Sequence, residues 1–168
     1  LCRRMHLDAE QATLQDLITV SRNDKSGHVE FATCTDGNHG KGVSWAAGLL
    51  GCKAHVFMPY GSQEVRAEAI RNAGPAEVAI TGMSYDETVR YAREQSEKKG
   101  WVLIQDTAWD GYEEIPEQIV QGYLTLASEA VEDLDRMGVL PTHVFLQAGV
   151  GAMAGGVLAF LADYYKGK

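Results

Sequence analysis

Five short apolar runs, separated by helical patterns, constrain the fold of this 168-residue chain more than any other feature. The runs are rich in Val, Ile, Phe or Leu and cover residues 29–33, 54–58, 77–81, 101–105 and 143–147. Continuous apolar runs are typical of parallel strands that helices bury on both faces. We therefore predict an α/β fold, a doubly wound and mostly parallel sheet built from βαβ units.

The predicted helices carry recognisable start and stop signals. Ser84 and Glu87 have the spacing of a capping box, and Gly100 is expected to end the helix that follows. Ser62 is expected to cap the preceding helix, which Gly74 would end.

Two further helices are expected near the ends of the chain. Asp8 and Gln11 are predicted to open an N-terminal helix. A long helix is predicted to begin near Pro116 and to end at Gly138.

The polar stretch 110–117, which contains Gly and Pro, separates four closely spaced strands from the long helix. We place a domain boundary there. Residues 1–113 would form a small α/β domain, and residues 114–168 would form the start of a larger one.

Composition argues against several kinds of partner. The net charge is −8, and basic residues such as Arg66 and Arg90 are scattered on expected helix faces, so neither nucleic acid nor an anionic membrane is expected. No apolar run approaches the roughly 20 residues that span a bilayer, and no secretory leader opens the chain. Three cysteines without metal or disulfide spacing predict reduced thiols, no metal site and a cytoplasmic location.

Ligands of doubly wound sheets bind at the carboxyl ends of strands, so the loops there are the candidate sites. The first such loop spans residues 35–40, where glycines permit close approach and Asp36 and Asn38 offer a carboxylate and an amide. An ordinary turn would also use these residue types.

The second loop, residues 105–112, contains Asp106 and two aromatic residues. It suits a polar amino-acid site, but Asp106 as a helix cap and Trp109 as a core anchor explain it equally well.

The third loop lies within residues 147–156, and its central residues are Gly149, Val150, Gly151, Ala152 and Met153. Small residues there would expose successive N–H groups at a helix N-terminus, which suits a phosphate group. Glycines chosen only for tight helix–strand packing are the alternative. The loop is neither a dinucleotide-binding nor a Walker motif.

Together the three loops resemble the fold-type II pyridoxal-phosphate enzymes, the group of threonine dehydratase, cysteine synthase and the tryptophan synthase β chain. The stretch 72–78 is similar to that group, although Pro75 stands within the usual Gly-Ala pattern. Within the group, residues 35–40, 105–109 and 147–156 most resemble the diaminopropionate ammonia-lyases, and the likeness extends from about Phe31 to the end of the chain.

The resemblance implies an α,β-elimination that converts 2,3-diaminopropionate to pyruvate and two ammonia molecules, in a homodimer. It assigns Asn38 to the ring hydroxyl of pyridoxal phosphate and residues 149–153 to its phosphate. Asp36 would remove the α-proton of the D-substrate. Asp106 would assist at the substrate, by pairing with its β-ammonium group or by handling a proton.

One departure from the family matters most. The family's Schiff-base lysine precedes the first strand in a Phe-Lys context, whereas the first lysine here, Lys25, lies in a polar run, and Lys41 occupies a solvent-facing helix position. We therefore expect a fragment of a longer parent enzyme that is itself inactive. A serine/threonine dehydratase-like lyase and a non-catalytic α/β binding module are the alternatives.

Overall fold

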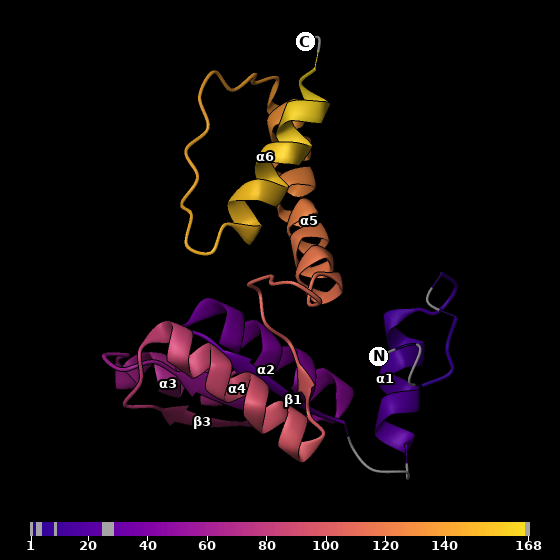
Figure 1. Ribbon diagram of the computed structural model, residues 1–168. Coiled ribbons are helices and arrows are strands. Elements are labelled where there is room, and N and C mark those ends of the chain that lie inside the picture. Colours follow the sequence, from indigo (N-terminus) through magenta and orange to yellow (C-terminus); the bar gives the residue numbers. More distant parts are fainter. Residues whose placement is uncertain (1, 3–4, 9, 25–28, 167–168) are drawn as a thin grey trace. The chain divides into compact units, whose positions relative to one another are not determined.

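The computed structural model describes residues 2, 5–8, 10–24 and 29–166. The chain divides into two compact units, Leu1–Ile104 and Gln105–Lys168, each described by itself below (Figure 1). The expected domain division after residue 113 stays a prediction.

A four-stranded, entirely parallel sheet forms the centre of the first unit. Its order is β3-β2-β1-β4, and the strands are β1 (Glu30–Cys34), β2 (Lys53–Met58), β3 (Ala76–Ile80) and β4 (Val102–Leu103). The predicted α/β class is confirmed, and so are four of the five predicted strands. Parallel strands present their carboxyl ends at one edge, so the loops after β1 and β4 leave from neighbouring strands.

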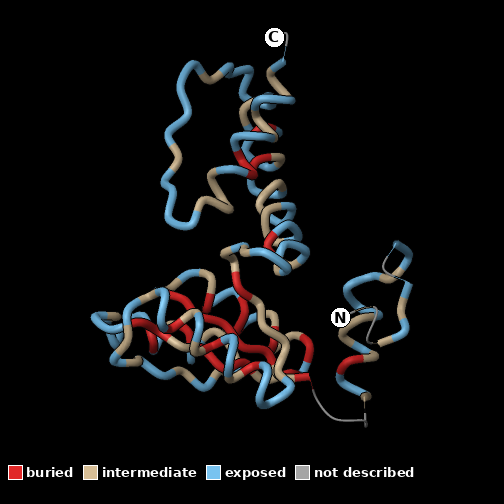
Figure 2. The backbone as a smooth tube through the Cα atoms, in the orientation of Figure 1, coloured by how far each residue is buried: buried red, intermediate tan, exposed pale blue. Residues whose placement is uncertain are grey.

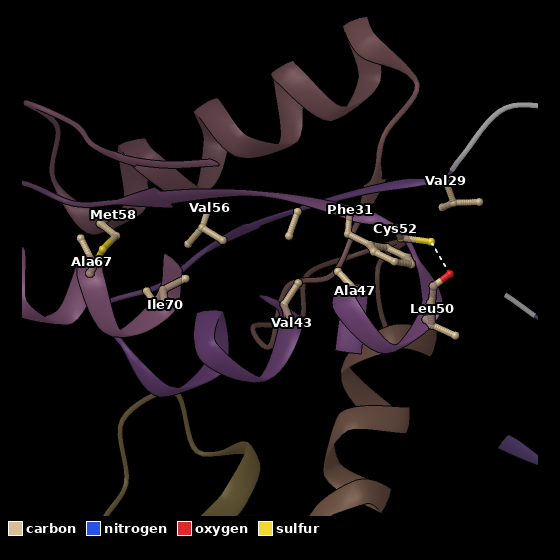
Figure 3. Packing of buried hydrophobic residues seen from close by; sticks show 11 residues of the cluster. Val29, Phe31, Val43, Ala47, Leu50, Cys52, Val56, Met58, Ala67 and Ile70 are labelled. Carbon is tan, nitrogen blue, oxygen red and sulfur yellow. Dashed lines mark hydrogen bonds between the residues drawn. The ribbon is translucent and has the colours of Figure 1, made fainter. Parts of the chain in front are cut away.

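Helices cover both faces of this sheet, with α2 (Asn38–Leu50) and α3 (Glu64–Arg71) on one face and α4 (Tyr85–Lys99) on the other. The first helix, α1 (Leu14–Asn23), contacts α2. The main core lies between the sheet and α2 and α3, where Ala47, Val56 and Ile70 are fully buried (Figures 2 and 3). Successive strand side chains point to opposite faces. Phe57 accordingly turns to the other face and meets Tyr91 of α4 edge to face, with ring centres 5.1 Å apart.

The predicted capping box of α4 is confirmed. Ser84 Oγ accepts a hydrogen bond from the Glu87 backbone N–H, the Glu87 side chain returns to the Ser84 N–H, and Gly100 follows with φ 72°. The predicted start of α3 is wrong by one residue, because Gln63 rather than Ser62 occupies the N-cap position. Gly74 does not end α3 either, since the helix stops at Arg71.

The predicted start of the N-terminal helix is also wrong. Asp8 O accepts hydrogen bonds from the N–H groups of Gln11 and Ala12, which makes a separate turn. The helix α1 begins later, behind a capping box of Thr13 and Asp16.

The far end of α1 is anchored to α2. Buried Ser21 donates from Oγ to Leu50 O at 2.9 Å, and Arg22 Nε donates to Leu49 O at 3.0 Å. Carbonyls at the end of α2 thereby gain partners that the helix itself cannot supply.

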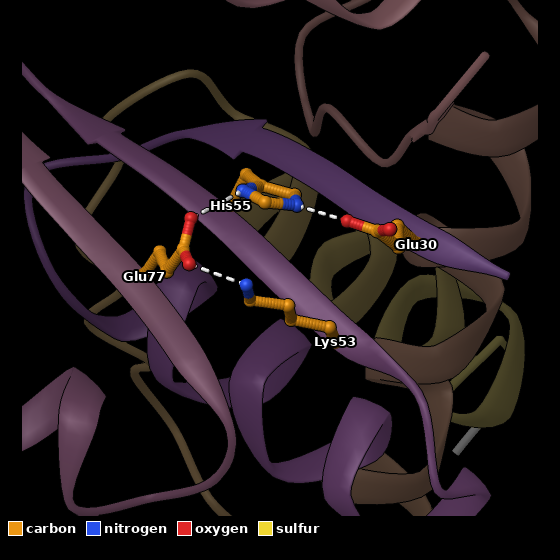
Figure 4. A network of polar contacts seen from close by, with 4 residues as sticks. All are labelled: Glu30, Lys53, His55 and Glu77. Carbon is orange, nitrogen blue, oxygen red and sulfur yellow. Dashed lines mark hydrogen bonds and ion pairs between the residues drawn. The ribbon is translucent and has the colours of Figure 1, made fainter. Parts of the chain in front are cut away.

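A polar cluster of Glu30, Lys53, His55 and Glu77 crosses β1, β2 and β3 (Figure 4). Buried His55 contacts Glu30 through Nε2 and Glu77 through Nδ1, the latter at 3.2 Å, and its ring stacks on Trp101 at 3.6 Å. These residues lie in the amino-terminal halves of the strands, away from the loops at their carboxyl ends. The cluster therefore joins strands rather than lining the candidate site.

In the described residues of the second unit, 105–166, two helices lie side by side, α5 (Glu114–Met137) and α6 (Ala152–Tyr164) (Figure 1). They approach closely at Gly156, where an added Cβ would lie 2.9 Å from Val120 O. Pro116 lies buried in the first turn of α5, and Gly138 follows its end with φ 65°, as predicted.

The fifth predicted strand is wrong. Residues 143–147 form no strand, and Phe145 is 92% exposed. A strand is stable only when a neighbour pairs with its N–H and C=O groups, and the described part of the second unit contains no other strand. An apolar run alone could not reveal that missing neighbour.

None of the helices in the described ranges is both long enough and apolar enough to cross a membrane.

Candidate functional site

The loop between β1 and α2 is organised by Thr35, a buried residue that sequence reasoning missed. Its Oγ1 accepts hydrogen bonds from the N–H groups of Gly37 (3.0 Å) and Gly40 (3.2 Å). One hydroxyl thus fixes both ends of the segment that carries Asp36 and Asn38. A threonine two residues before a glycine is a recognised turn pattern, so the sequence held a weak signal.

Gly40 permits the first turn of α2 to pack directly on this threonine. A Cβ there would lie 2.4 Å from Thr35 Cγ2, closer than packed atoms can come. The side chain of Asn38, the first residue of α2, lies on the exposed side of the turn.

Asp36 is held by a residue from another helix. Arg66 Nη1, on α3, donates to Asp36 O at 3.1 Å and lies 3.7 Å from Asp36 Oδ2. The sequence predicts Arg66 on a solvated helix face, and both side chains are indeed more than half exposed. Such an exposed pair adds little stability, so its main effect is to orient the carboxylate.

His39 connects the same turn to the end of β4. Its Nε2 donates to Ile104 O at 2.8 Å, because a carbonyl oxygen can only accept. Ile104 N–H in turn donates to Ala32 O of β1 at 2.8 Å. The start of α2 is therefore fixed to the residue just before the second loop.

The second loop opens the second unit. Gln105 is fully buried, and its Nε2 donates to Asp106 Oδ1 at 3.0 Å. Tyr112 closes the loop with its hydroxyl at the backbone of Gln105, and its ring stacks on Trp109 with centres 4.3 Å apart. Asp106 thus begins no helix, and its carboxylate remains partly exposed.

The third loop ends at the N-terminus of α6. Gly151 is the N-cap with φ 95°, a conformation that favours glycine, and it offers no capping side chain. The first turn of α6 has no acidic residue, and a Cβ added at Gly149 or Gly151 would meet nothing within 4 Å. By contrast, α1 and α4 both have capping boxes. The positive helix end and the open space beside these glycines fit an anion such as a phosphate group.

The structure brings Asp36 and Asn38 together in one loop of the first unit. It places Asp106 and residues 149–153 in the second. Lys41 is exposed, as the sequence predicts, and Lys25 lies outside the described residues. No lysine in the described ranges is buried.

The parallel sheet with helices on both faces defines a doubly wound α/β protein, a class in which the loops at the carboxyl ends of the strands are the usual ligand sites. The sequence pattern of the family described as pyridoxal-phosphate dependent enzyme matches residues 12–167, so the chain belongs to this family.

Individual members of the family differ in how similar they are to this chain. A diaminopropionate ammonia-lyase of Escherichia coli (strain K12) is 53% identical over 165 residues, which is 98% of this chain and 40% of the relative. The crystal structure of the Escherichia coli enzyme in complex with D-serine is similar with a TM-score of 0.89, covering 98% of this chain and 41% of that one. A threonine dehydratase of Haemophilus influenzae is 33% identical over 149 residues, 87% of this chain and 26% of the relative. The chain spans about 40% of the length of the ammonia-lyases it matches.

Proposed function

We propose that the whole protein to which this chain belongs eliminates ammonia from 2,3-diaminopropionate. With one water, the reaction gives pyruvate and two ammonia molecules. The observation that carries the proposal is the 53% identity with a diaminopropionate ammonia-lyase across 98% of the chain, against 33% with a threonine dehydratase.

Pyridoxal phosphate is the proposed cofactor. Residues 149–153 would hold its phosphate group, a role supported by the uncapped start of α6 and the open space at Gly149 and Gly151. Asn38 would contact the ring hydroxyl, which suits an exposed amide fixed at the first turn of α2. When bound, the cofactor supplies an electron sink for negative charge at the α-carbon of the substrate.

Asp36 is the proposed base for the α-proton of the D-substrate. Its support is an accessible carboxylate, 74% exposed, whose backbone is fixed by Thr35 and Arg66. A carboxylate becomes an effective base when it is held within hydrogen-bond reach of the proton in a site that excludes water.

Asp106 is the proposed partner of the substrate's β-ammonium group or of a proton in transit. A carboxylate that an amide orients is suited to a cationic amino group. This second charge would favour diaminopropionate over serine or threonine, whose β-substituent is a neutral hydroxyl.

Turnover by the whole protein tests the proposal. D- and L-2,3-diaminopropionate, L-serine and L-threonine are supplied separately, and 2-oxo acid and ammonia are measured. The proposal expects preferred turnover of diaminopropionate with two ammonia molecules per pyruvate. Preferred turnover of serine or threonine, with one ammonia per 2-oxo acid, would instead identify a dehydratase.

We also propose a homodimer in the cytoplasm, with residues 1–113 and 114–168 belonging to a small and a large domain. Cys2, Cys34 and Cys52 form no disulfide in the described part of the chain. Light scattering of the whole protein tests the proposed homodimer, and cell fractionation tests the proposed cytoplasmic location.

A further inference from the structure

The loop that carries Asp106 is closed by a single hydroxyl group. Tyr112 Oη accepts a hydrogen bond from Gln105 N at 2.8 Å and lies 3.4 Å from Gln105 O, to which it donates. Tyr112, the last residue of the loop, is therefore hydrogen-bonded to both the N–H and the C=O of Gln105, the first residue. Asp106 is the next residue along the chain.

Gln105, fixed at its backbone by Tyr112, in turn orients the carboxylate of Asp106. Its side chain is fully buried, and its Nε2 donates to Asp106 Oδ1 at 3.0 Å. An amide fixed at its backbone and enclosed at its side chain presents its N–H in one direction. The Asp106 carboxylate is oriented accordingly.

The Tyr112 ring is itself fixed. It stacks on the Trp109 indole at 4.3 Å with an interplanar angle of 15°. The backbones of the two residues form an antiparallel bridge, in which Tyr112 N donates to Trp109 O at 2.8 Å. The hydroxyl thus projects from a rigid base, which a positioning group requires.

We propose that Tyr112 is a positioning residue for Asp106 and acts on it through Gln105. This inference rests on the proposed role of Asp106 at the substrate. Tyr112 itself need not touch the substrate.

The protonation state of Tyr112 agrees with this role. Burial raises the pKa of the Tyr112 hydroxyl, the hydrogen bond from the Gln105 backbone opposes that rise, and the nearby Asp106 charge adds to it. The hydroxyl therefore stays neutral at physiological pH and can both accept from N–H and donate to C=O.

Tyr112→Phe in the whole protein is the first arm of the test, because phenylalanine keeps the stack on Trp109 and loses only the hydroxyl. We expect kcat for diaminopropionate to fall by about tenfold or more, since small misplacements of reacting groups have effects of this size. KM should change less. Tyr60→Phe is the control, since Tyr60 is 80% exposed and lies outside the loop. Wild-type kcat in Tyr112→Phe, with only a lowered melting temperature, would overturn the proposal.

A double-mutant cycle separates positioning from general loss of structure. If Tyr112 acts through Asp106, then adding Tyr112→Phe to Asp106→Asn should change kcat very little. Losses that multiply in full would overturn the proposal.

A measurement that does not depend on turnover tests the contact between Tyr112 and Asp106 separately from the proposed function. Carbon-13 tyrosine NMR of the whole protein follows the titration of Tyr112, assigned by its loss in Tyr112→Phe. Removing the Asp106 charge by Asp106→Asn should move that titration to lower pH. If Asp106→Asn keeps wild-type turnover, the proposed role of Asp106 at the substrate fails, while this titration still reports whether Tyr112 lies near the Asp106 charge. An unchanged titration would overturn the inference.

Discussion

Two residues around the start of α2 show how strongly a local arrangement depends on a few atoms. Thr35 supplies one hydroxyl to two N–H groups, and Gly40 supplies the absence of a side chain that lets Thr35 lie against the helix. Asp36 and Asn38 depend on both. Asp36 and Asn38 could be predicted as candidates from their side-chain chemistry. The supporting roles of Thr35 and Gly40 could not, because they depend on the packing of the folded chain.

Gly40→Ala should destabilise the fold by about 1–3 kcal/mol, because the added Cβ would overlap Thr35. Gly42→Ala is a matched control in the same helix, where an added Cβ meets nothing within 4 Å. An exposed helical glycine replaced by alanine should instead gain about 1 kcal/mol. Urea unfolding measures both variants, and equal shifts in the two would contradict the packing argument.

The contact between Arg66 and Asp36 could not be predicted from the sequence. These residues lie thirty positions apart and come from different elements. No periodicity or spacing joins them, so the sequence assigned Arg66 to a solvated surface. The position was correct, but the partner depended on how α3 packs beside α2, which follows the Asp36 loop.

At the scale of elements, α4 offers a direct test of helix capping. Ser84→Ala removes the hydroxyl that accepts from Glu87 N–H and should cost about 1 kcal/mol of unfolding free energy. Gln63→Ala is the comparison, since Gln63 is the N-cap of α3 and makes no side-chain capping bond. Its effect should be much smaller, and an equal loss in both variants would show that the capping bond does not carry the stability.

The charged pair across β2 and β3 predicts a dependence of stability on pH. The hydrogen bond with Lys53 lowers the pKa of Glu77, and the same bond raises the pKa of Lys53. Glu77 therefore stabilises the fold above its unfolded-state pKa, and this contribution is lost as the pH falls through the lowered folded-state pKa.

Glu77→Gln should flatten the acid side of the stability profile, measured as urea midpoints over a series of pH values. Glu94→Gln is the control, because Glu94 lies on the exposed face of α4, 3.9 Å from Lys98. A profile of Glu77→Gln that keeps its acid slope would contradict the assignment.

Elements with local causes could be predicted, and those with distant causes could not. The capping box at Ser84 and the helix end at Gly138 depend on neighbouring residues and were found. The strand expected at residues 143–147 depends on a pairing partner and did not form. The predicted start of α1 failed for a different reason, because Asp8 makes a separate turn and a capping box of Thr13 and Asp16 begins the helix.

At the scale of the whole molecule, the chain carries the loops that we propose for the cofactor ring and phosphate, but no buried lysine among its described residues. It spans about 40% of the length of the ammonia-lyases it matches.

The 168-residue chain alone should not form a covalent link with pyridoxal phosphate. Borohydride reduction followed by peptide mass spectrometry measures this, with the whole protein as the positive control. An exposed lysine such as Lys41 lacks the desolvation that activates a lysine amine, so only sparse, scattered labelling is expected. Stoichiometric labelling at Lys25 or Lys41 would contradict the prediction.

We propose that the loops of this chain serve an elimination from diaminopropionate, with Asp36 as the base for one stereoisomer. Asp36→Asn keeps the size of the side chain and removes its basicity. Turnover of D- and L-2,3-diaminopropionate by this variant of the whole protein tests the claim most directly. We predict that turnover of the D-isomer falls by about a hundredfold or more, the range expected for loss of a general base, while the L-isomer is affected far less. Equal losses on both isomers, or unchanged turnover of the D-isomer, would contradict the account.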